Sequence, residues 1–76
     1  RMRYSAASLA RRLEGEVLLR MTVSEEGRVT GVTILVSSGH GALDFEAMNL
    51  ARQWRFGPAP RDWSLRVPFD YTLKGR

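Results

Sequence analysis

The sequence contains no cysteine and only one histidine, which excludes several kinds of site. Without cysteine the chain can form neither a disulfide nor a cysteine metal site, and a lone imidazole with carboxylates rarely holds zinc. We therefore expect no metal and no cofactor. The absence of disulfides does not indicate the cellular compartment, because many periplasmic and extracellular domains lack them too. No apolar run exceeds three residues, so these 76 residues contain neither a membrane span nor a signal peptide.

The sequence also lacks a concentrated block of charge. Twelve Lys and Arg against eight Asp and Glu give a net charge of +4, and the close basic groups, such as Arg1/Arg3, Arg11-Arg12 and Arg52/Arg55, hold no more than two residues each. Neither a basic run nor a base-stacking aromatic motif accompanies them. We interpret the charge as a solvated surface, with a basic α+β nucleic-acid-binding module as an alternative function.

The length allows one small domain with a single core, because a chain of this size buries only about 60% of its unfolded surface. We expect residues 1–76 to form that domain, with 1–3 as a flexible N-terminal end and 74–76 as a C-terminal tail. The chain opens on Arg1-Met2-Arg3 with no leader, so we interpret it as an excised or terminal domain of a longer protein.

The clearest pattern is a strand from Trp63 to Leu73. Every odd position in it is apolar and every even position is polar or proline, which predicts a half-buried strand. Pro68 stands in its middle. Since proline has no N–H to donate to a ladder, we expect this strand at the edge of a sheet.

An edge strand has one free side, and the backbone groups of successive residues point alternately to the two sides. If Pro68 faces the open side, the inner ladder uses the odd positions Leu65 to Tyr71. The outward groups then belong to Ser64, Arg66, Asp70 and Thr72. Such an edge is either guarded by its proline and charges or offers a place where an extended peptide adds as a further strand.

Two helices are predicted. A short one covers Tyr4 to Leu13, with Ser5 as its N-cap and Gly15 ending it. The main helix covers Ala42 to Trp54, because apolar residues recur there at the spacing of one helix face. These residues are Leu43, Ala47, Leu50, Ala51 and Trp54.

Two further strands precede the main helix. Glu16 to Val23 alternates between apolar and other residues, with Val17, Leu19, Met21 and Val23 on one face. Ser24 to Gly27 supplies a turn in which Gly27 takes the left-handed position. The second strand runs from Arg28 to Ser37, with Val32, Ile34 and Val36 sharing a face. Val29 is out of step with this alternation, and Gly31 lies between it and Val32, which predicts a bulge or kink.

Chain direction gives the topology. The helix returns the chain so that the last strand runs antiparallel to the first and lies beside it. The expected fold class is therefore α+β, a three-stranded antiparallel sheet of order 2-1-3 with two helices packed on one face. That face carries Val17, Leu19, Ile34, Val67 and Phe69.

Ser37, Ser38, His40 and Asp44 include the residue types of a nucleophile, a base and an orienting acid. All four lie within eight residues of one loop and helix start. Working triads instead gather groups from separated elements into a pocket. We predict no catalytic residues and no enzymatic activity. Trp54 and Phe56 are interpreted as core residues.

A series of short motifs, in order, resembles the C-terminal domain of TonB-type energy transducers. The motifs are Leu13-Glu14-Gly15-Glu16-Val17, Gly27-Arg28-Val29, Val36-Ser37-Ser38-Gly39-His40, Leu43-Asp44, Trp54-Arg55-Phe56, Pro58-Ala59 and Val67-Pro68-Phe69. The resemblance extends from about Tyr4 to Leu73. It departs from the family at Tyr4-Ser5, where Tyr-Pro is usual, and in the short segment between Pro60 and Trp63.

The resemblance implies a periplasmic domain, tethered to the inner membrane through an N-terminal segment absent here. Such a domain captures the TonB box of an outer-membrane transporter by β-strand addition to its last strand. It thereby couples proton-motive force to the uptake of iron-siderophore, haem or similar substrates. ExbB and ExbD would act through regions outside this chain. A TolA-like envelope interaction domain is a further alternative.

The resemblance places the TonB box along Ser64 to Leu73. The expected peptide-binding residues are Ser64, Arg66, Val67, Pro68, Asp70 and Thr72. Additional partner contacts are expected at Arg1, Arg3 and Tyr4, and at Arg20, which with Arg66 is available to an acidic residue in or near the box. The domain itself is expected to be a monomer or a weak dimer, since exposed edges can pair.

Overall fold

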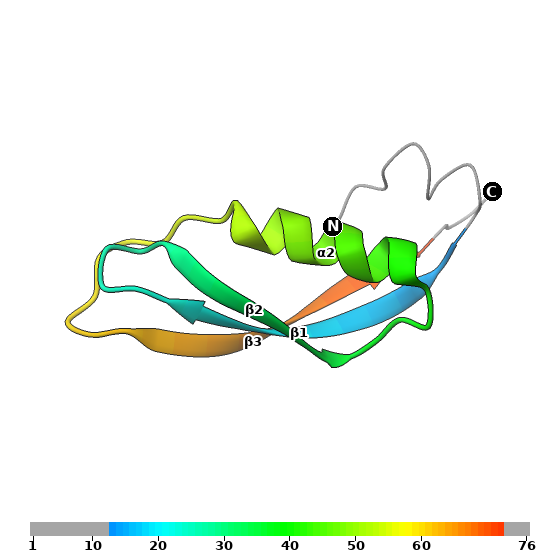
Figure 1. Ribbon diagram of the computed structural model, residues 1–76, viewed down its shortest axis with the longest axis horizontal. Helices are drawn as coiled ribbons and strands as arrows, with labels where there is room; N and C mark the ends of the chain where they lie inside the picture. Colours follow the sequence, from blue (N-terminus) through cyan, green and yellow to red (C-terminus); the bar gives the residue numbers. More distant parts are fainter. Residues whose placement is uncertain (1–12, 73–76) are drawn as a thin grey trace.

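The computed structural model describes residues 13–72, which form three strands and one helix (Figure 1). The elements are β1 (Gly15–Val23), β2 (Val29–Val36), α2 (Gly41–Arg52) and β3 (Trp63–Tyr71). The predicted short helix, apart from Leu13, lies outside the described residues, and so do both chain ends, 1–3 and 74–76. Among residues 13–72, no helix is long and apolar enough to cross a membrane.

The sheet is antiparallel, with the strand order β2-β1-β3, as predicted. A tight turn makes β2 the neighbour of β1 on one side. α2 then carries the chain back along one face of the sheet, so that β3 enters antiparallel to β1 on its other side (Figure 1). β3 is therefore an edge strand, as both its proline and the chain direction predict.

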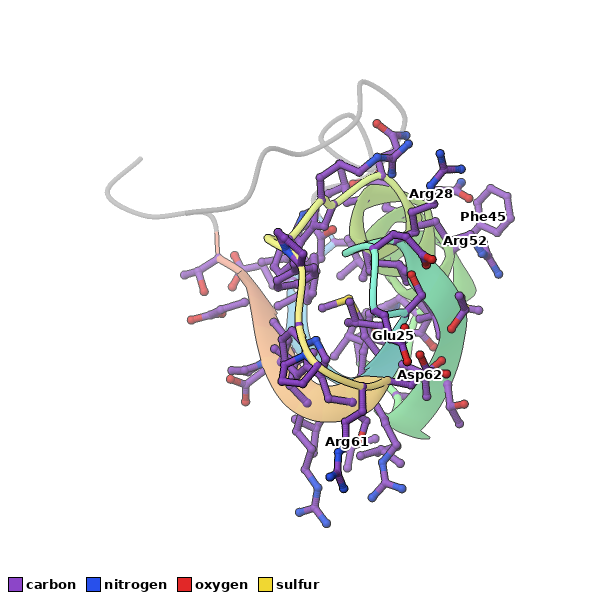
Figure 2. The ribbon with its side chains drawn as sticks, turned by 90° about the vertical axis from the view of Figure 1, so that its left-hand side faces the viewer. Glu25, Arg28, Phe45, Arg52, Arg61 and Asp62 are labelled. Carbon is purple, nitrogen blue, oxygen red and sulfur yellow. The ribbon has the colours of Figure 1, made fainter. Side chains whose placement is uncertain are left out.

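The core lies between α2 and the sheet face beneath it. β1 contributes the four alternating residues predicted for its inner face, all fully buried: Val17, Leu19, Met21 and Val23. α2 and β3 contribute the other buried residues of the core: Leu43, Ala47, Ala51, Phe69 and Tyr71. The opposite side of α2 faces solvent, where Phe45 is 64% exposed and projects away from the sheet (Figure 2).

α2 ends at Arg52, two residues before the predicted end at Trp54. Gln53 N–H donates to Leu50 O and Trp54 N–H to Ala51 O, both at 3.1 Å. These bonds reach back three residues rather than four, which tightens and ends the helix. Trp54 still packs on the core, stacked on Phe69 with ring centroids 5.4 Å apart. The interpretation of Trp54 as a core residue is confirmed.

β2 contains two irregularities, and only the first is predicted by the sequence. Opposite the step from Thr22 to Val23, β2 carries one extra residue, Thr30, which is the bulge expected beside Gly31. A second extra residue, Leu35, lies between the pairs Leu18↔Val36 and Leu19↔Ile34.

The second bulge corrects one prediction for the inner face, that of Val36. It shifts the alternation by one residue, so that Val36 pairs with the outer residue Leu18 and does not share the face of Val32. Ile34 pairs with the core residue Leu19 but is 36% exposed, because it stands on an edge strand. Ile34 thus lies on the predicted inner face, at its exposed margin.

The turn between β1 and β2 is bonded to the segment that follows α2. Phe56 N–H donates to Gly27 O, and Ala59 N–H donates to Glu25 O, each at 2.9 Å. Glu25 N–H donates in turn to Asp62 Oδ1 at 3.1 Å, and Figure 2 shows these two side chains next to each other. The turn thereby holds the chain at the point from which β3 begins.

Candidate functional site

The candidate site is the edge of β3 that faces away from β1. β3 and β1 pair over nine consecutive positions, from Gly15↔Tyr71 to Val23↔Trp63, without a register shift. Pro68 stands opposite Leu18 in the middle of this ladder. A proline facing β1 would remove a hydrogen bond there, so the continuous register favours Pro68 on the open side. Among residues 13–72, no strand lies on that side.

The side chains of β3 divide between two faces. Its odd positions point toward α2 and are half-buried or buried, and its even positions are exposed on the outer face of the sheet. Five of the six residues expected to bind a peptide lie together on this exposed face: Ser64, Arg66, Pro68, Asp70 and Thr72. Val67 differs, because its side chain packs against the core.

The other expected contacts have separate outcomes. Arg20 is exposed on β1, directly opposite Arg66, as the prediction of a joint role requires. Arg1, Arg3 and Tyr4 lie outside the described residues. Asp70 has a local partner, since Thr72 Oγ1 donates to its Oδ1 at 2.8 Å.

The outer face also contains residues that the sequence reasoning did not select. Glu16, Leu18, Val36 and Pro68 line an open hollow of about 180 Å³ that spans all three strands. Leu18 could have been found from the sequence, because it is an apolar residue on the otherwise polar face of an alternating strand. Val36 could not, because it reaches this face only through the bulge at Leu35.

The serines and the aspartate of the loop before α2 form a hydrogen-bonded cluster. Asp44 accepts hydrogen bonds from Ser37 Oγ, from Ser38 N–H at 3.0 Å and from Ser38 Oγ at 2.8 Å. Ser38 Oγ in turn accepts the N–H of His40 at 3.0 Å. These bonds join the end of β2 to the first turn of α2, so the cluster has a structural explanation. Within residues 13–72, no group of three His, Cys, Asp or Glu residues could hold a metal ion.

The pKa of Asp44 reflects this cluster. Burial raises the pKa and is the largest single effect. The hydrogen bonds from Ser37 and Ser38, together with the charge of His40, outweigh it and bring the pKa below the ordinary value for aspartate. The position of Asp44 in the first turn of α2 also favours the charged form.

Acid titration of Asp44 is therefore expected to weaken the fold. A depressed carboxylate pKa contributes stability in full above its unfolded value, about 3.9, and loses it as the pH falls through the lower folded value. Between pH 5 and pH 2, the free energy of unfolding should decrease less in Asp44→Asn than in the parent chain. Urea unfolding across that range measures the effect, with Glu26→Gln at the exposed turn as the matched control. Parallel pH curves for the parent and Asp44→Asn would contradict it.

Comparisons with known proteins place this chain in a family. The family described as Gram-negative bacterial TonB protein C-terminal matches residues 1–74. Protein tonB2 of Pseudomonas aeruginosa is 37% identical over 75 residues, covering 92% of this chain and 28% of that protein. Protein TonB of Escherichia coli (strain K12) is 36% identical over 72 residues, covering 95% of this chain and 30% of that protein. The chain thus spans less than a third of these relatives.

The fold is also similar to a solved structure. The solution NMR structure of the Pseudomonas aeruginosa TonB CTD matches with a TM-score of 0.79 at 24% identity, covering 97% of this chain and 80% of that chain. The TonB family consists of energy transducers and not of enzymes, in agreement with the prediction of no enzymatic activity. The chain belongs to the family of TonB C-terminal domains.

Proposed function

We propose that this chain is the periplasmic, peptide-capturing domain of an energy transducer, and that it binds the TonB box of an outer-membrane transporter along β3. The observation that carries the proposal is the open edge of β3, with Pro68 in its middle and one neighbouring strand among the described residues. Family membership supplies the partner class. The rest of such a transducer would provide the inner-membrane anchor and the contacts to ExbB and ExbD.

Strand addition suits a domain that transmits force. The outward N–H and C=O groups of Ser64, Arg66, Asp70 and Thr72 would bond the peptide backbone, each bond contributing about 0.5 to 1.5 kcal/mol net. Several such bonds pulled along the strand direction share the load, so moderate affinity is compatible with mechanical resistance. On its other side β3 is held by its nine-position pairing with β1, which is loaded in the same direction.

An NMR titration with a TonB-box peptide tests the proposal. We expect the largest amide shifts at the outward N–H groups of Ser64, Arg66, Asp70 and Thr72, and smaller shifts at the odd positions between them. Shifts concentrated on β2 or on the outer side of α2 would contradict strand addition at β3. Salt-dependent binding of oligonucleotides without any binding of the peptide would instead support the nucleic-acid alternative.

A further inference from the structure

Like charges stand directly opposite each other on the outer face of β1 and β3. The register pairs Glu16 with Asp70 and Arg20 with Arg66. Between these two pairs lies the apolar pair of Leu18 and Pro68. Every second position of β3 therefore contributes to a pair on the outer face. The pair at Arg66 is basic, the pair at Pro68 is apolar and lies beside the hollow, and the pair at Asp70 is acidic.

This arrangement is unfavourable for the isolated domain. Like charges that face each other across neighbouring strands are destabilising, whereas opposite charges are stabilising. In the described part of the chain, neither Arg20 nor Arg66 has a carboxylate within salt-bridge distance, and Asp70 is bonded only by the hydroxyl of Thr72. A strand of complementary charge added beside β3 would relieve both repulsions.

We propose that the outer face selects peptides by charge order, a proposal that rests on strand addition to β3. The peptide would carry an acidic residue beside Arg66, an apolar residue beside Pro68 and a basic residue beside Asp70. These three peptide positions are two residues apart, because alternate side chains of a strand share one face.

Strand geometry brings the required groups within reach. Directly opposite side chains on adjacent strands have Cβ atoms about 4.5 to 5.5 Å apart, so the peptide residues would contact Arg66, Pro68 and Asp70 directly. Arg20 and Glu16 lie one strand further in, about 10 Å from the peptide backbone, and both have long side chains. A long aliphatic peptide side chain above Pro68 would lean toward the hollow that Leu18 and Val36 line.

Three kinds of short peptide test the charge order, and the mixed kind is made in both sequence orders so that it tests an added strand of either direction. All carry an apolar residue at the centre. Two positions before and after it they carry either one glutamate and one lysine, two glutamates, or two lysines. We expect one order of the mixed peptide to bind about three- to tenfold more tightly than the other peptides in low salt, and the difference to shrink as salt is added.

The outcomes separate this inference from the proposed function. If all three kinds of peptide shift alternate amides of β3 with equal affinity, strand addition stands and the charge order is wrong. Tightest binding of the peptide with two glutamates would also overturn it, because attraction to a domain of net charge +4 would then suffice. If no peptide perturbs β3, the proposed function itself fails.

A charge reversal gives a second, independent test. Glu16→Lys with Asp70→Lys makes both ends of the outer face basic, so the peptide with two glutamates should become the tightest ligand. Glu25→Lys with Glu26→Lys adds the same charge at the exposed turn beyond the other end of β1 and is the matched control. The inference is overturned if both double variants change the peptide ranking equally.

Discussion

Gly27→Ala is expected to destabilise the domain by about 3 kcal/mol, a large part of the roughly 4 to 11 kcal/mol typical of this length. Gly27 has a φ of 92°, where a Cβ costs about 1 to 2 kcal/mol. The added Cβ would also lie 1.8 Å from Phe56 O, so the turn and the segment after α2 must separate. Overpacking of this kind adds about 1 to 3 kcal/mol.

Gly39→Ala is the matched control, because it measures the cost of a Cβ at positive φ without a steric clash. Gly39 has a nearly identical φ of 91°, but its Cβ would meet nothing within 4 Å. We expect a loss of about 1 to 2 kcal/mol there. Urea denaturation of both variants measures the difference. Equal losses would show that the close approach of Gly27 to Phe56 contributes nothing to stability.

Arg66→Pro is expected to weaken peptide binding about tenfold or more while the domain remains folded. The substitution removes an N–H on the open side of β3, worth about 0.5 to 1.5 kcal/mol, and its ring also obstructs the approaching strand. Arg66→Ala keeps the N–H and should weaken binding less, since an exposed ion pair contributes about 0 to 1 kcal/mol. Isothermal titration calorimetry with a TonB-box peptide compares the two variants.

Val67→Pro is the control that tests which residues of β3 direct their N–H groups toward β1. The N–H of Val67 is expected to bond β1 at Leu19, within the continuous ladder. Its loss should therefore unfold or strongly destabilise the domain, whereas Pro68 shows that the open side of β3 tolerates proline. Thermal unfolding monitored by circular dichroism reports this. If Arg66→Pro unfolds the domain and Val67→Pro does not, the two sides of β3 are reversed and the proposed docking positions are wrong.

The sequence alone determined the parts of this protein that depend on local periodicity and on chain direction. The alternation from Glu16 to Val23 predicted the buried face of the central strand, and the alternation around Pro68 predicted an edge strand with an exposed polar face. The helix between the second and third strands returns the chain, so that the third strand runs antiparallel to the first and the strand order is 2-1-3. These features follow from side-chain spacing and backbone chemistry, which do not depend on any distant partner.

The tertiary structure decided what depends on pairing between separated segments. The bulge at Leu35 exists only against the register of β1, and it pairs Val36 with Leu18 so that Val36 lines the same hollow as Pro68. The approach of Gly27 to Phe56 arises where the turn meets the segment after α2. The opposition of Arg20 to Arg66 likewise depends on how β3 aligns with β1. A shift of one residue would turn the side chains of a strand to the other face, so only the assembled sheet could establish these contacts.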